Sequence, residues 1–275
     1  MTQKIKVSNF EISNSNKLTI IAGLNVLEND ELTFKVANEL KAIVESKGNP
    51  FIFKASFDKA NRSSVDSYRG PGLDEGLKTF SELRRLGHTL ITDVHEINQV
   101  NKIADVVDVI QIPAFLCRQT DLIKEVCETG KPINVKKGQF LSPNQMKNII
   151  TKCNSFGNNQ ILLCERGTSF GYDNLVVDML GISKLKTFKS PVIFDVTHSL
   201  QLPGQGQTAA GGRADQAVDL AKAGVALGIA GVFIEVHPDP KNALCDGPCA
   251  TSLDKFENLL DEVNKVDIAV KDFIK

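Results

Sequence analysis

Short, nearly continuous apolar runs recur along the chain, and stretches with helical periodicity separate them. The first run covers residues 18–22 and ends at Gly23, which is typical of a strand buried on both faces. Residues 28–45 follow with apolar side chains at helical spacing. Further strands are expected at residues 51–55, 89–93, 109–113, 133–136, 161–165, 192–195 and 231–235. Further helices are expected at residues 74–86, 97–104, 120–129, 143–153, 174–187, 215–228 and 253–273.

This alternation of eight strands with eight helices predicts one parallel α/β domain over residues 1–275. The number of units favours a closed (β/α)8 TIM barrel over a doubly wound sheet. No Gly-x-Gly-x-x-Gly motif follows a strand, which removes the main reason to expect a dinucleotide-binding fold. Residues 5–12 alternate in polarity, so we expect residues 1–16 to form a short N-terminal β-hairpin extension.

The composition, 42% hydrophobic and 24% charged, is that of a soluble globular protein. The net charge of −1 argues against bulk electrostatic binding of nucleic acid. No apolar run approaches the roughly 18 residues of a membrane span, and the N-terminus lacks the apolar core of a signal peptide. The six cysteines are scattered, and Cys245 and Cys249 have no second pair or nearby histidine to complete a zinc site. We therefore expect a cytoplasmic protein with reduced thiols and without nucleic-acid or membrane partners.

Cationic and hydrogen-bonding side chains follow the expected strand at residues 51–55. The cations are Lys54, Lys59, Arg62 and Arg69, and the short polar side chains between them are Ser56, Asn61, Ser63 and Ser64. Such a segment is suited to a small, multiply anionic ligand, because arginine and lysine supply charge and serine and asparagine supply donors. The alternative is a positively charged loop that faces solvent.

A barrel would bring the carboxyl ends of all its strands onto one rim. We expect four cations to converge there: Lys54, Lys59, Lys136 and Arg166. Because no matching number of acids is expected beside them, an anionic ligand must offset their repulsion. A phosphorylated carboxylic acid, or two phosphorylated substrates, would fit. The same rim would carry Asn25, Asp93, Gln111, Asp195, His198, Glu235 and Asp246.

Each of these residues also has a structural interpretation. Lys136 can be a lysine that extends its charged end to water, and Arg166 can pair with the adjacent Glu165. The histidines and aspartates can cap strands and helices, namely His198, His237, Asp93 and Asp195.

Motifs spread over residues 17–270 resemble the 3-deoxy-D-manno-octulosonate 8-phosphate synthase family. They are KASFDKANRSS (54–64), SYRGPG (67–72), TDVHE (92–96), DVIQIPAFLCRQTDL (108–122), NVKKGQF (134–140), FGYDNLVVDM (170–179), VIFDVTHS (192–199), HPDP (237–240) and CDGP (245–248). The segment KANRSS is the specific part, since the related 3-deoxy-D-arabino-heptulosonate 7-phosphate synthases typically have lysine-proline-arginine-threonine-serine there.

The resemblance implies a homotetrameric (β/α)8 barrel that condenses phosphoenolpyruvate with D-arabinose 5-phosphate for lipopolysaccharide inner-core synthesis, with the N-terminal hairpin capping the bottom of the barrel. Lys54, Ser56 and Lys59 would hold the carboxylate of phosphoenolpyruvate. Its phosphate would contact Lys136 and Arg166, supported by Gln111 and the backbone near Ala114. Arabinose 5-phosphate would contact Asn61, Arg62, Ser63 and Asp93, with Arg62 and Ser63 near a neighbouring subunit. The catalytic set would be Asn25, Lys59, His198, Glu235 and Asp246, in which His198 and Asp246 handle protons and position water.

Members of this family that use a metal bind it with cysteine, histidine, glutamate and aspartate. Three of these ligands correspond here to His198, Glu235 and Asp246, but the cysteine position is Asn25, a poor substitute for a thiolate. The CDGP motif is similar to metal-independent members, whereas residues 137–139 and 201–204 are more similar to metal-using ones. We expect no metal and no cofactor.

Three other functions remain open from the sequence: a seven-carbon synthase, a Schiff-base aldolase that uses the amine of Lys136, and a phosphosugar-binding protein without activity. The sequence does not predict the order of the loops at residues 200–212 and 241–251.

Overall fold

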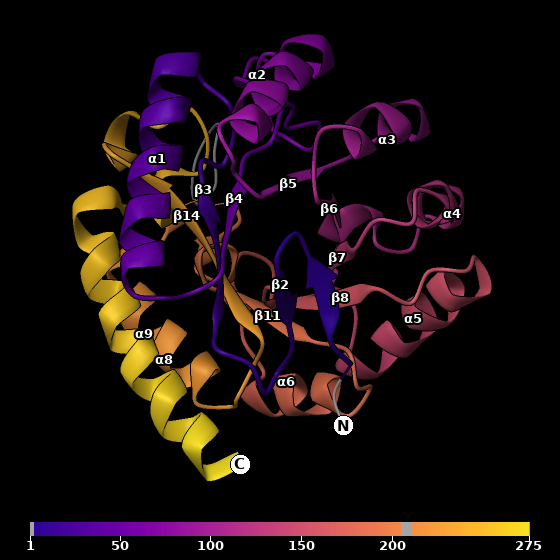
Figure 1. Cartoon of the computed structure of the whole chain (residues 1–275), viewed down its shortest axis with the longest axis vertical. Helices are drawn as coiled ribbons and strands as arrows, with labels where there is room; N and C mark the ends of the chain where they lie inside the picture. The colour runs from indigo at the N-terminus through magenta and orange to yellow at the C-terminus, as the bar shows by residue number, and fades with distance from the viewer. Residues whose placement is uncertain (1–2, 205–210, 275) are drawn as a thin grey trace.

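The computed structural model describes residues 3–204 and 211–274. Its centre is a closed ring of parallel strands (Figure 1): β3 (Thr19–Gly23), β4 (Phe51–Lys54), β5 (Leu90–Asp93), β6 (Val109–Ile112), β7 (Ile133–Lys136), β8 (Ile161–Glu165), β11 (Val192–Asp195) and β14 (Gly231–His237). Neighbours in this order are paired, and β14 closes the ring by pairing with both β11 and β3. The predicted (β/α)8 barrel is therefore confirmed.

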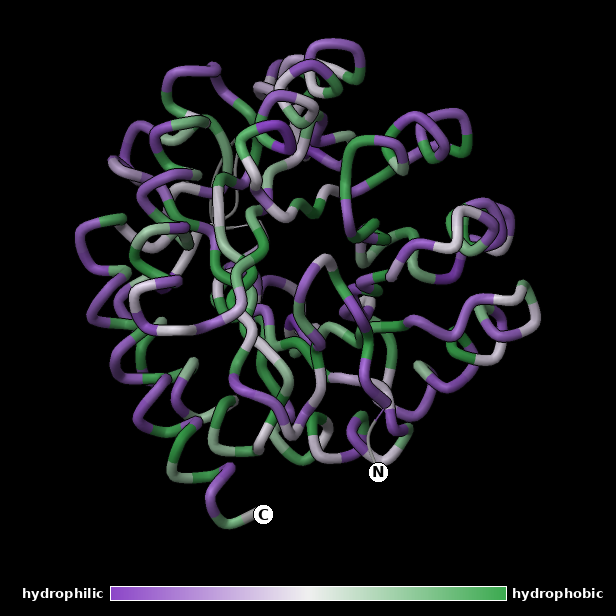
Figure 2. Tube along the Cα trace, viewed as in Figure 1, coloured by the Kyte–Doolittle hydropathy of each residue, from purple (hydrophilic) through white to green (hydrophobic). Residues whose placement is uncertain are grey.

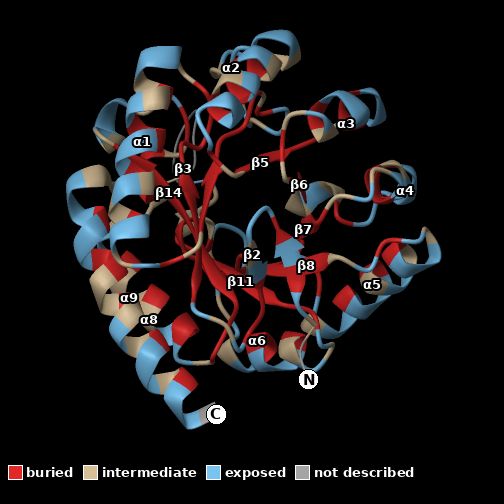
Figure 3. Cartoon of the chain, viewed as in Figure 1, coloured by how far each residue is buried: buried red, intermediate tan, exposed pale blue. Residues whose placement is uncertain are grey.

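Eight helices form the outer layer (Figure 1): α1 (Asp30–Ser46), α2 (Leu73–Arg85), α3 (Ile97–Ala104), α4 (Thr120–Glu128), α5 (Met146–Ser155), α6 (Met179–Lys186), α8 (Ala217–Val225) and α9 (Leu253–Ile274). Their inner faces are buried and their outer faces exposed (Figure 3). In α1 the side chain of Asn29 caps the first turn by accepting a hydrogen bond from the backbone N–H of Leu32 at 2.8 Å. Val36, Leu40 and Val44 form its buried stripe.

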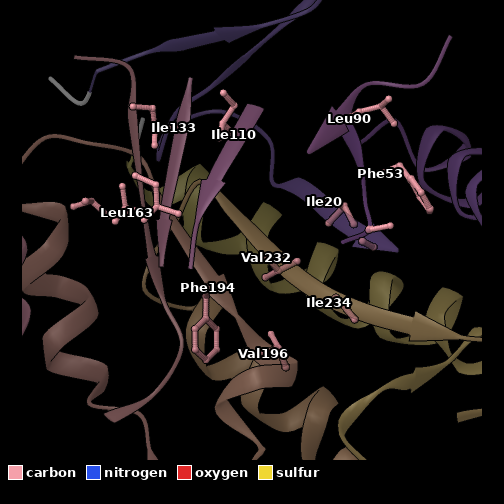
Figure 4. Close-up of a cluster of buried hydrophobic side chains, with 14 of the residues drawn as sticks. Ile20, Phe53, Leu90, Ile110, Ile133, Leu163, Phe194, Val196, Val232 and Ile234 are labelled. Atoms are coloured by element: carbon pink, nitrogen blue, oxygen red, sulfur yellow. The ribbon is translucent and has the colours of Figure 1, made fainter. Parts of the chain in front are cut away.

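Most apolar side chains of the barrel lie between the strands and the helices (Figure 4). Ile20, Phe53, Leu90 and Ile110 belong to this layer. Ile21, the next residue after Ile20, belongs instead to the cluster inside the barrel, because successive strand residues point to opposite faces. Figure 2 shows the same division, with hydrophobic residues concentrated along the strands and the inner sides of the helices.

The predicted N-terminal hairpin is present as β1 (Ile5–Val7) and β2 (Phe10–Ile12), which pair antiparallel. Ile5, Val7 and Ile12 are buried in the same cluster as Ile21 and the other inward-facing barrel residues. The side chain of Asn14 accepts a hydrogen bond from the first residue of β11 at 2.8 Å. The hairpin therefore closes the amino-terminal end of the barrel. Residues 1–2 of the predicted extension lie outside the described part.

The elements between the barrel units depart from the prediction. The helix expected at residues 174–187 begins only at Met179, because the preceding residues form a hairpin of β9 (Thr168–Ser169) and β10 (Leu175–Val176). A one-turn helix, α7 (Val196–Ser199), follows β11 directly and was not expected. Short strands β12 (Gln201–Leu202) and β13 (Gly211–Gly212) also pair, and β15 (Thr251–Ser252) extends alongside β14. Residues 205–210 of the loop left open at 200–212 lie outside the described part.

Two absences hold for the described residues. No helix there combines the length and the hydropathy required to cross a bilayer. All six cysteines are buried and free.

Candidate active site

A cavity of about 300 Å³ opens at the carboxyl ends of the strands. Most of the predicted site residues line it: Lys54, Lys59, Asn61, Arg62, Ser63, Asp93, Gln111, Lys136, Arg166, His198 and Asp246. Asn25, Ser56 and Glu235 do not line the cavity but contact residues that do, as their hydrogen bonds show. The barrel thus brings strand-end residues from all around the ring to one place, as the (β/α)8 fold requires.

Lys54, at the end of β4, forms an ion pair with the carboxylate of Glu235. Nζ of Lys54 donates to Oε1 of Glu235 at 2.7 Å and to the backbone carbonyl of Asn25 at 3.0 Å. Both side chains are almost completely buried. Burial lowers the pKa of Lys54, while Glu235 acts in the opposite direction.

A second buried carboxylate, Asp195, organises the end of β7. Its side chain accepts a hydrogen bond from Nζ of Lys136, and it lies 2.8 Å from Nδ1 of His198. It also caps α7 by accepting from the backbone N–H of His198 at 3.0 Å. Burial alone would raise the pKa of Asp195, but His198 and Lys136 hold it below its usual value. The capping interpretation of Asp195 is therefore correct, and the same carboxylate also positions two pocket residues.

Lys136 is buried, so it does not extend to water as the alternative interpretation proposed. Its Nζ lies 3.2 Å from the centroid of the Phe233 ring, close enough for a strong cation–π contact. The His198 ring lies 5.8 Å from the same ring. Phe233 thus forms an apolar support beneath both side chains.

The expectation that the four pocket cations lack matching acids is wrong for two of them. Glu235 and Asp195 pair with Lys54 and Lys136. Each acid comes from a strand two positions along the ring from the strand of its lysine: Glu235 on β14 faces Lys54 on β4, and Asp195 on β11 faces Lys136 on β7.

Two cations of the pocket form no ion pair within the described residues: Lys59 and Arg166. Burial lowers the pKa of Lys59, but nearby carboxylates, chiefly that of Asp93, raise it overall. Arg166 donates from Nη2 to Oε1 of Gln201 at 2.6 Å, and its buried Nη1 has no partner among the residues that the structure describes. Its backbone N–H donates to Oε1 of Glu165, so the expected Glu165–Arg166 pair is a backbone contact. These two cations are available to an anion.

Asp93 connects the pocket to buried polar groups behind it. It accepts a hydrogen bond from the hydroxyl of Ser56, and its Oδ2 lies 3.2 Å from Nε2 of His95. Burial alone would raise the pKa of Asp93, whereas Lys59 and His95 lower it well below the usual value. Asp93 is therefore an anion that accepts hydrogen bonds, and it does not cap a helix.

The loop after β4 carries Asn61, Arg62 and Ser63 to the mouth of the cavity. Its base is closed by backbone hydrogen bonds, including one of 2.7 Å from Lys59 to the carbonyl of Arg69. Gly70 adopts a φ of +116°, and a Cβ there would meet the carbonyl of Phe57 at 2.5 Å, so glycine is required.

Two contacts of this loop were not expected from the sequence. Nη1 of Arg62 donates to Sγ of Cys245 at 2.6 Å. Arg69, which the sequence grouped with the anion-binding cations, instead pairs with Asp58 outside the cavity.

Sequence reasoning missed Gln139, Gln201 and Cys245, which also line the cavity. The signals for Cys245 were its place in the CDGP motif and its position directly before Asp246. The surrounding groups raise its pKa to about 12, with burial as the main cause, so it is a neutral thiol. Gln139 and Gln201 lie in segments that were compared with family members, but neither was assigned to the site, because the hydrophobic pattern does not determine the path of their loops.

The fold and the pocket together define a (β/α)8-barrel protein with a cavity lined by cations at the carboxyl ends of its strands. Comparison with known proteins identifies the family to which the chain belongs within this class. Residues 3–272 match the DAHP synthetase I family, and the chain belongs to that family.

The similar proteins carry the same name, and the similarity covers nearly the whole length of each. The 2-dehydro-3-deoxyphosphooctonate aldolase of Pseudomonas putida (strain GB-1) is 56% identical over 275 residues, which cover 99% of this chain and 98% of the relative. The protein of that name from Pseudomonas entomophila (strain L48) is also 56% identical, and that from Pseudomonas syringae pv. syringae (strain B728a) is 54% identical, both with the same coverage.

Proposed function

We propose that this protein condenses phosphoenolpyruvate with D-arabinose 5-phosphate and water, giving 3-deoxy-D-manno-octulosonate 8-phosphate and inorganic phosphate. The product would serve lipopolysaccharide inner-core synthesis in the cytoplasm. The observation that carries the proposal is the meeting of Lys59 and Arg166, which form no ion pair with the described residues, in one cavity. A cavity with cations left over after its internal ion pairs is suited to phosphorylated substrates. The name shared by its relatives supports this choice of reaction.

Phosphoenolpyruvate would occupy the deeper part of the cavity. Its phosphate would contact Lys136 and Arg166, with Gln111 in support, and its carboxylate would contact Lys59, with Lys54 and Ser56 behind. Nη1 of Arg166 is buried without a partner from residues 3–204 and 211–274, which supports the phosphate position, because a buried donor without an acceptor is costly until a ligand supplies one.

Arabinose 5-phosphate would approach from the mouth, where Asn61 and Ser63 are exposed and Arg62 is half-buried. Its hydroxyls would donate to the Asp93 carboxylate. Both substrates would then lie in contact within one cavity. Holding them together supplies several kcal/mol of the barrier reduction, since the reaction no longer has to bring them together from solution.

In the reaction, C3 of the enol attacks the aldehyde carbon and positive charge develops at C2. Water then adds to C2, and phosphate departs with cleavage of the C–O bond. Nε2 of His198 lies 3.8 Å from Oε1 of Glu235 and 3.9 Å from Oδ2 of Asp246, so these three groups surround a position suited to proton transfer and water orientation. Near-full turnover in Asp246→Ala would refute this role.

We propose that the reaction needs no metal. The three residues that correspond to family metal ligands are engaged otherwise: Glu235 with Lys54, Asp246 with Asn25 and Gln201, and His198 with Asp195. The amide N–H of Asn25 donates to Asp246, and its neutral amide oxygen is a poorer metal ligand than the thiolate of metal-using members. Within residues 3–204 and 211–274, no group of three or more histidine, cysteine, aspartate or glutamate side chains is arranged to hold a metal.

We also propose a homotetramer in which Arg62 and Ser63 lie near a subunit interface. Large apolar side chains on the loops after β6, β7 and β8 are exposed in the single chain: Phe115, Phe140, Phe170 and Tyr172. Exposed aromatic groups next to a binding cavity are typical of protein–protein contact surfaces. Light scattering during size-exclusion chromatography would measure the assembly, and a monomeric mass would refute it.

The deciding experiment measures phosphate release from phosphoenolpyruvate plus arabinose 5-phosphate, with and without excess EDTA. We expect equal turnover in both. Loss of turnover in EDTA would leave the proposed reaction supported but would refute the metal-independent mechanism. Absence of release in both would refute the reaction.

A parallel assay with erythrose 4-phosphate tests the seven-carbon synthase. Trapping with borohydride tests a Schiff base on Lys136, which the pairing of its ammonium group with Asp195 disfavours.

A further inference from the structure

Lys137 is completely buried, although it lies next to the pocket lysine Lys136. Because consecutive residues at a strand end point in opposite directions, its side chain leaves the pocket and enters the barrel wall between β7 and β8. Its ammonium group is surrounded by oxygen atoms from two loops: Thr168 Oγ1 at 3.0 Å, the carbonyl of Gly167 at 3.3 Å, the carbonyls of Gly138 and Leu141 at 3.4 Å, and Glu165 Oε1 at 3.4 Å.

The carboxylate in this set, Glu165, fixes the backbone at the end of β8. Its Oε1 accepts from the backbone N–H of Arg166 at 3.0 Å and from that of Gly167 at 2.8 Å. Gly167 has a φ of +89°, so the chain turns sharply there. Lys137 contacts the same carboxylate and the carbonyl of Gly167. It therefore holds the turn from which the Arg166 side chain enters the cavity.

The other contacts of Lys137 hold the loop after β7. The carbonyls of Gly138 and Leu141 bracket Gln139, which lines the cavity. The backbone N–H of Ser169 donates to the carbonyl of Gln139 at 3.1 Å, so the two loops are also joined directly. Lys137 thus connects the segment that follows Lys136 to the segment that carries Arg166.

We propose that Lys137, together with Glu165, is a positioning residue that sets the direction of Arg166 relative to Lys136. The inference rests on the proposed function, since it assigns this pair to the phosphate of phosphoenolpyruvate. A buried ammonium group is costly to desolvate and adds little net stability when it is paired. With five oxygen atoms around it, the group fixes the geometry of two loops, and binding of a phosphate depends on that geometry.

The test compares Lys137→Met with the wild-type enzyme by steady-state kinetics and by calorimetric titration with phosphoenolpyruvate alone. We expect the KM and the Kd for phosphoenolpyruvate to rise by about tenfold or more, because a misplaced Arg166 would no longer reach the phosphate in the required geometry. The KM for arabinose 5-phosphate should stay unchanged. Lys271→Met is the matched control, because Lys271 is also buried and pairs with Asp267 at 2.6 Å on α9. That variant should bind phosphoenolpyruvate as the wild type does.

Glu165→Gln is the second variant, and it decides the question if Lys137→Met does not fold. It keeps an oxygen for the two backbone N–H groups but removes the charge that pairs with Lys137. The expected result is the same selective rise in KM and Kd, smaller in size. Unchanged phosphoenolpyruvate binding, or an equal loss for both substrates, overturns the positioning role. A wild-type enzyme that neither binds nor converts phosphoenolpyruvate instead overturns the proposed function.

Discussion

Asn25 donates a hydrogen bond of 2.7 Å from Nδ2 to Oδ2 of Asp246, across a sequence separation of 221 residues. The contact joins the loop after β3 to the loop after β14. Gln201 donates to the same oxygen at 3.0 Å. Burial alone would raise the pKa of Asp246, but His198, Lys59 and the Asn25 hydrogen bond lower it, so the carboxylate stays ionised.

Replacement of Asn25 by aspartate should therefore make activity strongly pH-dependent. In Asn25→Asp two carboxylates would face each other, and repulsion would favour a proton shared between them. We expect turnover at pH 8 to fall by about 100-fold, the usual size of a lost proton-transfer arrangement, and to recover in part as the pH falls. Rate profiles between pH 5.5 and 8.5 measure this effect. Asn25→Ala adds no charge and is the control; parallel profiles for the two variants would contradict the prediction.

Asp195→Asn should impair both stability and turnover. The change leaves the buried ammonium group of Lys136 without its carboxylate and weakens the contact to His198. Removing one partner of a buried ion pair typically costs about 3–5 kcal/mol of unfolding free energy. Urea unfolding and steady-state kinetics measure the two effects.

Asp58→Asn is the matched control for that change, because Asp58 pairs with Arg69, whose side chain is largely exposed. Such a pair contributes about 0–1 kcal/mol, so Asp58→Asn should unfold nearly as the wild type does. Equal losses in the two variants would show that the burial of the Asp195 pair does not matter.

Phe233→Leu tests the apolar support beneath the pocket. Loss of the ring removes the contact at 3.2 Å to Nζ of Lys136 and the packing against His198. We expect a loss of about 1–3 kcal/mol in unfolding free energy and a raised KM for phosphoenolpyruvate, because both side chains lose their support. Phe256→Leu on α9 is the control, since Phe256 is equally buried in the outer core layer. It should lose stability without a change in KM, and the same KM in both variants would contradict the role of Phe233.

The barrel was predictable because its strands are buried on both faces and appear in the sequence as unbroken apolar runs. Residues 161–165 and 192–195 match β8 and β11. The hairpin of β9 and β10 was not predictable, since two-residue strands carry no periodicity and depend on contacts such as that of Val176 with Thr168.

The positions of the site residues were predictable to the extent that they follow strands. Lys54, Lys136 and Arg166 come at strand ends, and the fold places all such ends on one rim. Their partners were not predictable, because Lys136 meets Asp195 across 59 residues and Arg62 meets Cys245 across 183. The first contact depends on the placing of β7 and β11 two strands apart, and the second on the path of two loops, and neither leaves a local pattern.

Stability should decline as the pH falls below about 6.5, with His88 as one identifiable cause. Its buried ring lies with Nε2 3.0 Å from Oδ1 of Asn38, and burial, aided by Lys41, lowers its pKa to about 4. The unfolded chain binds a proton near pH 6.5 while the folded chain does not, so acid favours unfolding. This single group can remove at most about 1.4 kcal/mol for each pH unit down to pH 4. Urea unfolding at pH 7.5 and pH 5 should show a smaller difference for His88→Gln than for the wild type. An identical difference in the two proteins would exclude His88 as a contributor.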